Sequence, residues 1–139
     1  MSCLFDSVAA LLSDRAGLVR DAPFDVLRAM TWPPTGRALR DAVCALLTAD
    51  ALTVHDIGLD EWGAMEAGTS RVAYVTGMRD EGTWGGGVEI AALAEALRVP
   101  IEVHGAASAV FGEAHRPVRP LLLHYTGSHY TPSAERSLF

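Results

Sequence analysis

Nine consecutive residues, 82–90, read GTWGGGVEI. The three adjacent glycines enforce a loop, because glycine interrupts regular secondary structure. Apolar residues then recur at helical spacing from Ile90 to Leu97, which predicts an amphipathic helix that ends before Pro100. The middle of the chain is therefore expected to be a glycine-rich loop that leads directly into a buried helix.

The residues after Pro100 differ in character from those before it. Alternation over 101–103 predicts a strand, 109–111 is a weaker strand candidate, and the largely apolar run 121–125 suits a buried central strand. Upstream, helices are predicted directly after Cys3, from Pro23 to about Met30, after Thr35, over 60–67 and after Ser70, with 14–21 as a connection. Helices followed by strands predict an α+β fold, with helices packed around a small, mostly C-terminal β-sheet.

Length and composition limit the classes of protein that fit. With 139 residues, half of them apolar, the chain is expected to form a single domain over 1–139. The net charge of −6 disfavours binding to nucleic acid or to an anionic membrane, since both require basic patches. No apolar run approaches the roughly 20 residues that are needed to cross a bilayer.

Cysteine and histidine usage bounds the redox setting and the metal chemistry. Two cysteines, Cys3 and Cys44, do not make a disulfide scaffold, so a reducing, cytoplasmic location is expected. No Cys/His cluster has the spacing of a zinc site, and His124 and His129 have no evident further ligands. The sequence therefore predicts neither a metal nor another cofactor.

A possible nucleophile and a possible base lie at opposite ends of the chain. Cys3 opens an apolar helix, and His129 follows the strand candidate 121–125 after a Thr-Gly-Ser turn. Such groups need to be close only in space, and the N-terminus of a helix favours the thiolate form of a cysteine. The same backbone amides can stabilise an oxyanion. Cys44 lies among apolar residues of a predicted helix and is expected to belong to the core.

Three segments in this order resemble the ovarian-tumour (OTU) family of cysteine proteases, most of which are deubiquitinases. Its members carry Cys-Leu-Phe at the start of a helix, a Trp-Gly-Gly loop before a Glu-containing helix, and a final strand and turn before His-Tyr or His-Phe. The matching segments here are CLF at 3–5, GTWGGGVEI at 82–90 and HY at 129–130. The resemblance implies the papain-type α+β fold of these proteases, with Cys3 as nucleophile and His129 as general base.

The resemblance also implies roles for neighbouring residues. It places Trp84, Gly85 and Gly86 near the channel for the Gly-Gly tail of ubiquitin. Tyr130 is a further candidate for substrate binding, either as a wall of the site or as a packing residue. The position two after the histidine, often Asp or Asn in the family, is Thr131, whose hydroxyl can orient an imidazole only weakly. The chain contains no Asn that could replace it. The family's Asp three positions before the cysteine would precede Met1.

The activity implied by the resemblance is hydrolysis of peptide or isopeptide bonds after the C-terminal glycine of ubiquitin, polyubiquitin or a ubiquitin-like modifier. Two alternatives stay open. One is a viral-type protease that uses the same Cys–His pair to process a polyprotein. The other is an inactive OTU-like module that only binds ubiquitin, which Thr131 and the short segment before Cys3 favour.

Overall fold

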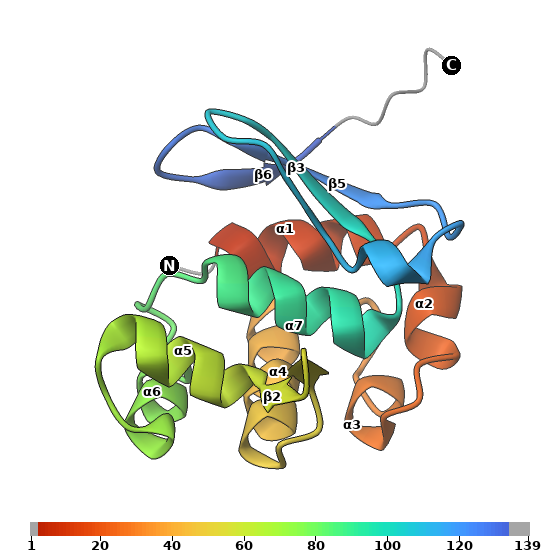
Figure 1. The fold of residues 1–139 in the computed structure, drawn as a ribbon. Helices are drawn as coiled ribbons and strands as arrows, with labels where there is room; N and C mark the ends of the chain where they lie inside the picture. Colours follow the sequence, from red (N-terminus) through yellow and green to blue (C-terminus); the bar gives the residue numbers. More distant parts are fainter. Residues whose placement is uncertain (1–2, 134–139) are drawn as a thin grey trace.

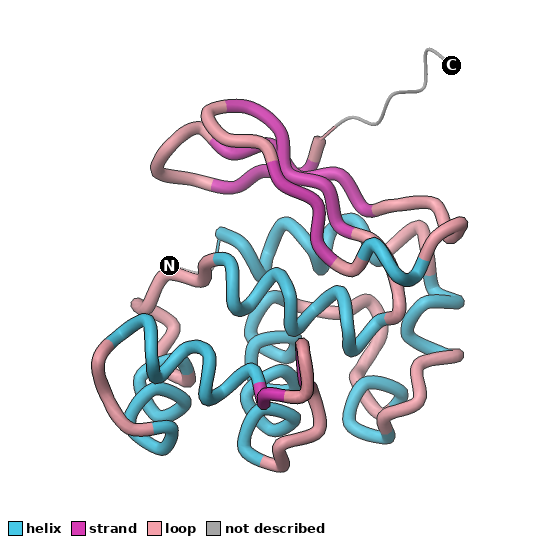
Figure 2. Tube along the Cα trace, viewed as in Figure 1, coloured by secondary structure: helices cyan, strands magenta, loops and turns pink. Residues whose placement is uncertain are grey.

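A four-stranded mixed sheet lies on one side of a group of helices in this computed structural model, which describes residues 3–133 (Figures 1 and 2). Its strands, in spatial order, are β4 (Ala109–Phe111), β3 (Ile101–Gly105), β5 (Leu121–Tyr125) and β6 (Tyr130–Pro132). The central strands β3 and β5 are parallel, whereas β4 and β6 pair antiparallel at the two edges.

Two helices pack against the sheet and a third supports them. Helix α1 (Cys3–Leu12) contacts β5 and β6, helix α7 (Gly87–Leu97) contacts β4, and both contact α4 (Gly36–Thr48). Their apolar faces form one core with the central strands, in which Leu93 and Leu123 are fully buried. The α+β fold predicted from the sequence is confirmed. No helix of residues 3–133 is long and apolar enough to span a bilayer.

The remaining elements surround α4. Helices α5 (Leu59–Ala67) and α6 (Arg71–Met78) contact each other and α4. The short elements are α2 (Ala16–Arg20), α3 (Asp25–Arg28), β1 (Thr53–Val54), β2 (Ile57–Gly58) and the 3₁₀ turn Glu113–His115. The helices predicted after Thr35 and Ser70 are confirmed, and both residues cap them: the Ala38 N–H donates to Thr35 Oγ1, and the Ala73 N–H donates to Ser70 Oγ, each at 3.1 Å.

Two local predictions were wrong. The predicted connection 14–21 contains the helix α2, which is too short to be stable alone and is held by burial of Val19. The predicted helix 23–30 is reduced to the four residues of α3. Strand β6 was not predicted either, because two of its three residues are exposed and its sequence carries no apolar alternation.

Replacing Phe5 by alanine is expected to lower the free energy of unfolding by about 3–5 kcal/mol. The Phe5 ring is fully buried in α1 at the centre of the core, so truncation leaves a cavity. Urea unfolding measures the loss. The control is Val110→Ala on the edge strand β4, where the side chain is exposed and a change within about 0.5 kcal/mol is expected. Equal losses in the two variants would contradict this account of the core.

Candidate active site

Cys3 is the first residue of α1, and it is partly exposed. Directly after it, Leu4 and Phe5 are buried and fix the helix in the core. The first N–H groups of a helix have no partner within it, and together with the helix dipole they favour negative charge nearby. A thiolate, or the oxyanion formed when it attacks a carbonyl group, can be stabilised at this position.

Ser7 joins the start of α1 to the last strand. Its buried hydroxyl lies 2.6 Å from the Cys3 carbonyl oxygen and 3.0 Å from the Tyr130 carbonyl oxygen. Because one hydroxyl contacts both carbonyl groups, Cys3 and Tyr130 lie close together, and His129 is brought to the same end of α1. The role of Ser7 was not predicted, although a position four residues after Cys3 lies on the same helix face.

His129 is presented by the turn between β5 and β6. The Thr126 N–H donates to the His129 carbonyl at 2.9 Å, and the His129 N–H donates to Thr126 Oγ1 at 3.1 Å. Gly127 has a φ of +105°, a conformation that other residues rarely adopt. The turn is thus closed by its own hydrogen bonds, and His129 remains exposed at its end.

The loop between α6 and α7, residues 79–86, reaches both the histidine and the first helix; we call it the Trp84 loop. The ring centroids of Trp84 and His129 are 5.6 Å apart, with the planes tilted by 35°. A Cβ on Gly85 would come within 2.7 Å of Leu4 Cδ2, so a larger residue would displace Leu4. The three segments that the sequence analysis singled out therefore meet at the N-terminal end of α1.

A buried carboxylate fixes the end of the Trp84 loop. Glu89, in the first turn of α7, accepts a hydrogen bond of 2.8 Å from the Gly86 N–H and another from the Tyr74 hydroxyl. Burial raises the pKa of the Glu89 carboxyl, although these two hydrogen bonds and the charge of Arg40 act in the opposite direction. Glu89 therefore holds Gly86 in place at the cost of a buried charge. No sequence signal pointed to Tyr74.

We expect Glu89→Gln to stabilise the fold at neutral pH. Glutamine keeps an acceptor oxygen for Gly86 and removes a charge whose burial is unfavourable. The pKa of Glu89 in the folded protein lies above the ordinary value of 4.5. Protonated Glu89 therefore contributes its full stabilisation below pH 4.5, and this contribution is lost as pH rises through the folded pKa. Urea unfolding from about pH 4 to pH 8 should show a smaller decline for this variant than for the wild type.

Glu89→Ala is the matched control for this experiment. Alanine leaves the Gly86 N–H and the Tyr74 hydroxyl without their acceptor, so this variant should be less stable than the wild type by about 1–3 kcal/mol across the pH range. If Glu89→Gln instead has the pH profile of the wild type, titration of Glu89 is not linked to folding.

The predicted site residues are near one another, but the reactive pair is not hydrogen-bonded. Within residues 3–133, no hydrogen bond joins the Cys3 thiol to the His129 imidazole, or that imidazole to Thr131. Thr131 is exposed in β6 and pairs with His124 of β5. The arrangement is a thiol and an imidazole at one end of α1, without a formed catalytic dyad.

Tyr130, the residue after His129, packs against the preceding strand. Its half-buried ring stacks on Tyr125, with the centroids 4.7 Å apart. Burial raises the pKa of Tyr130, and Tyr125 and Cys3 act in the same direction. The phenol is therefore protonated at neutral pH.

The second cysteine is a core residue. Cys44 is fully buried in α4, and burial raises the pKa of its thiol to about 11, so its predicted place in the core is confirmed.

In the part of the chain that the structure describes, no three His, Cys, Asp or Glu side chains are grouped so that they could hold a metal ion.

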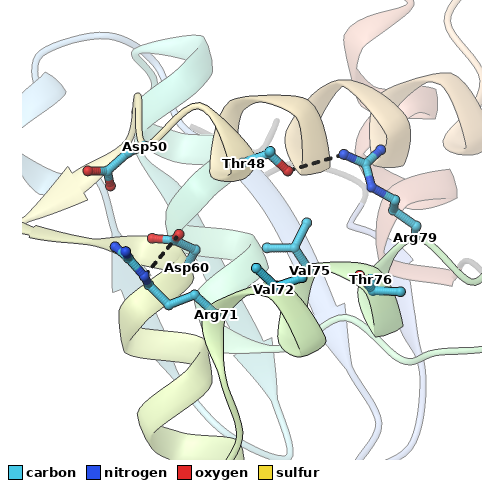
Figure 3. Close-up of a pocket in the computed structure, with 8 residues that line it drawn as sticks. All are labelled: Thr48, Asp50, Asp60, Arg71, Val72, Val75, Thr76 and Arg79. Carbon is cyan, nitrogen blue, oxygen red and sulfur yellow. Dashed lines mark hydrogen bonds and ion pairs between the residues drawn. The ribbon is translucent and has the colours of Figure 1, made fainter.

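A separate hollow of about 370 Å³ lies between the end of α4 and helix α6, away from Cys3 and His129 (Figure 3). Three of its charged side chains interact within the hollow: Arg71 Nε lies 4.0 Å from Asp60 Oδ2, and Arg79 donates to Thr48 Oγ1 at 3.1 Å. These contacts tie α6 to its neighbours. No residue of the candidate site lines this hollow.

Comparison with known proteins places these features in context. The family model for OTU-like cysteine proteases matches residues 2–130. A solved structure of an ovarian tumour (OTU) domain in complex with ubiquitin superimposes with a TM-score of 0.64 and 19% sequence identity. The match covers 94% of this chain and 62% of that one, so the chain spans less than two thirds of that protein. A search of curated protein sequences found no match.

Proposed function

Because the chain belongs to the family of OTU-like cysteine proteases, we propose that it is a deubiquitinating thiol protease with Cys3 as nucleophile and His129 as general base. The observation that carries the proposal is the meeting of three segments at the N-terminal end of α1. Cys3 begins the helix, the Ser7 hydroxyl draws the strand after His129 toward it, and Trp84 lies against the His129 ring.

Ubiquitin is the substrate that this site suits best. The OTU domain of the matched solved structure is in complex with ubiquitin. In this chain, Gly85 lies against Leu4, the residue after the proposed nucleophile, and a Cβ there would come within 2.7 Å of Leu4 Cδ2. The glycine thus lets the Trp84 loop approach the start of α1 closely, where the Gly-Gly tail of ubiquitin, polyubiquitin or a ubiquitin-like modifier would have to bind.

The proposed reaction begins with transfer of the Cys3 thiol proton to His129. The thiolate attacks the carbonyl carbon of the terminal glycine, and backbone N–H groups at the start of α1 stabilise the oxyanion. The intermediate collapses with cleavage of the C–N bond, while the His129 imidazolium gives its proton to the leaving amine. The products of this half-reaction are the free amine and a thioester on Cys3.

Hydrolysis of the thioester completes the cycle. His129 accepts a proton from a water molecule, and the resulting hydroxide attacks the thioester carbonyl. Cleavage of the C–S bond releases the C-terminal carboxylic acid of ubiquitin, which ionises to the carboxylate, and the His129 imidazolium returns its proton to the Cys3 sulfur. Because Cys3 and His129 are not hydrogen-bonded in this structure, the proposal requires a small movement of the His129 turn when substrate binds.

The decisive experiment uses ubiquitin that carries a thiol-reactive electrophile at its C-terminus. We expect one covalent adduct by mass spectrometry, and peptide mapping should place it on Cys3. The Cys44→Ala variant is the matched control and should form the adduct as the wild type does, because the Cys44 thiol is fully buried. An adduct on Cys44, or no adduct with a folded protein, would contradict the proposal.

A small neutral alkylating reagent distinguishes the two alternative functions, a polyprotein-processing protease and an inactive ubiquitin-binding module. A protein whose Cys3 reacts with the small reagent but not with the ubiquitin probe has a working thiol and a different substrate, as a polyprotein-processing protease would. A protein that binds ubiquitin tightly but reacts with neither probe is an inactive binding module.

A further inference from the structure

The most unusual buried side chain outside the reactive groups is Arg40 of α4. It is fully buried, although arginine is among the residues least often found inside proteins. Burial of a guanidinium group is unfavourable unless its N–H groups find acceptors. The contacts that it makes should therefore show what the side chain is for.

The Arg40 guanidinium holds the first half of the Trp84 loop through main-chain carbonyl groups. Nη1 donates to the Met78 carbonyl at 2.9 Å and to the Asp80 carbonyl at 3.1 Å. Nη2 donates to the Thr83 carbonyl at 2.8 Å. Because the acceptors are backbone atoms, these contacts fix the path of the chain and do not depend on which side chains the loop carries.

The other side of Arg40 contacts the helix that carries the proposed nucleophile. Its guanidinium carbon lies 4.6 Å from the centroid of the Phe5 ring, an arrangement in which the cation is attracted to the ring. Phe5 is two residues after Cys3 in α1. Arg40 thus contacts both α1 and the Trp84 loop from a single buried position.

Other contacts attach the two ends of the loop: Arg79 donates to Thr48 Oγ1, and Glu89 accepts from the Gly86 N–H, whereas Arg40 is the buried group that holds Asp80 and Thr83 between them. Residues 79–82 are exposed, and several of the loop's remaining hydrogen bonds are local, such as that from the Thr83 N–H to the Asp80 carbonyl at 3.0 Å. Local hydrogen bonds maintain the shape of a loop but do not fix its position. The residue after Thr83 is Trp84, which lies against His129. A displacement of Thr83 would therefore also displace the Trp84 ring relative to the His129 ring.

We propose that Arg40 is a positioning residue of the site: its buried guanidinium sets the Trp84 loop against α1 and thereby holds Trp84 against His129. The inference deepens the proposed function and rests on it for its catalytic meaning. The positioning itself can be measured without ubiquitin, so failure of one can be distinguished from failure of the other.

The first measurement is the fluorescence of Trp84 in a protein that also carries Trp32→Phe and Trp62→Phe. Contact with a histidine side chain quenches indole emission, so His129→Gln should raise the Trp84 intensity by removing this quenching. Arg40→Lys, which keeps the charge but loses the forked donor geometry, should reduce the quenching at least twofold.

The second measurement is amide hydrogen exchange. In Arg40→Lys, the Gly82 and Thr83 amides are expected to exchange about tenfold faster, while amides in the middle of α4 keep their protection. The matched control is Arg37→Lys. Arg37 is an exposed arginine of the same helix that contacts the same loop from outside, 3.7 Å from Glu81. The Arg37→Lys variant should leave both the hydrogen exchange of the loop and the quenching of Trp84 unchanged.

The third measurement connects positioning to the proposed chemistry. Arg40→Lys should slow adduct formation with the ubiquitin electrophile at least about tenfold, but should change alkylation of Cys3 by a small neutral reagent less than about twofold. An Arg40→Lys protein that keeps either the quenching or the slow loop exchange of its parent would overturn the positioning role. If both change and the ubiquitin probe reacts with neither protein, Arg40 positions the loop and the proposed substrate is wrong.

Discussion

Cys3→Ala is expected to abolish cleavage of ubiquitin chains, with a loss of at least about 10³-fold in kcat/KM. Removal of the nucleophile leaves only the oxyanion-stabilising amides and the binding surface, which cannot form the thioester. Cys3 is partly exposed and contributes little to the core, so the variant should fold as the wild type does. Gel-based cleavage of purified ubiquitin chains measures the loss, and thermal unfolding verifies the fold.

Two controls make this result specific. Cys44→Ala removes the only other thiol and should retain most of the activity, apart from a modest loss of stability. Cys3→Ala should still bind ubiquitin, because the binding surface is intact. Normal cleavage by Cys3→Ala would show that another group is the nucleophile, and the assignment would have to be abandoned.

His129→Ala is expected to lower kcat/KM by about 10²–10⁴-fold, the range that general acid–base groups contribute. His129 is exposed at the end of a self-contained turn, so its removal should not disturb the fold. The matched variant is Thr131→Ala, two residues further on. Its hydroxyl supplies no charge and makes no hydrogen bond to the imidazole in this structure, so the loss should be less than about tenfold.

The ratio of these two losses tests how the imidazole is oriented. If Thr131→Ala loses as much activity as His129→Ala, then Thr131 moves into contact during the reaction and is a third member of the site. If neither variant loses activity, the base is elsewhere. Chain cleavage at several pH values would measure both variants, with the wild type as reference.

Local sequence patterns predicted the elements that carry the core. The apolar spacing from Ile90 to Leu97, the glycines before it and the run 121–125 each correspond to an element of the structure. These patterns succeed because burial of one face, or of a whole strand, imposes a periodicity that can be read directly. The order of helices and strands then sufficed for the α+β class.

What the sequence did not predict depends on tertiary contacts. Helix α2 and strand β6 are too short to have a periodic signal, and they exist because the core and β5 support them. Arg40 reads as one more charge on an exposed helix face until its contacts to the backbone carbonyl groups of Met78, Asp80 and Thr83 are known. Because every residue has a backbone carbonyl group, the identities of the acceptor residues do not predict these hydrogen bonds.

The hydroxyl of Ser7 contacts a carbonyl group 123 residues further along the chain. A ribosome therefore makes α1 long before it makes β6, the strand that follows the proposed base. Until β6 docks on α1, Cys3 and His129 are not brought to the same end of that helix. Catalytic competence should accordingly appear only after this long-range contact has formed during folding.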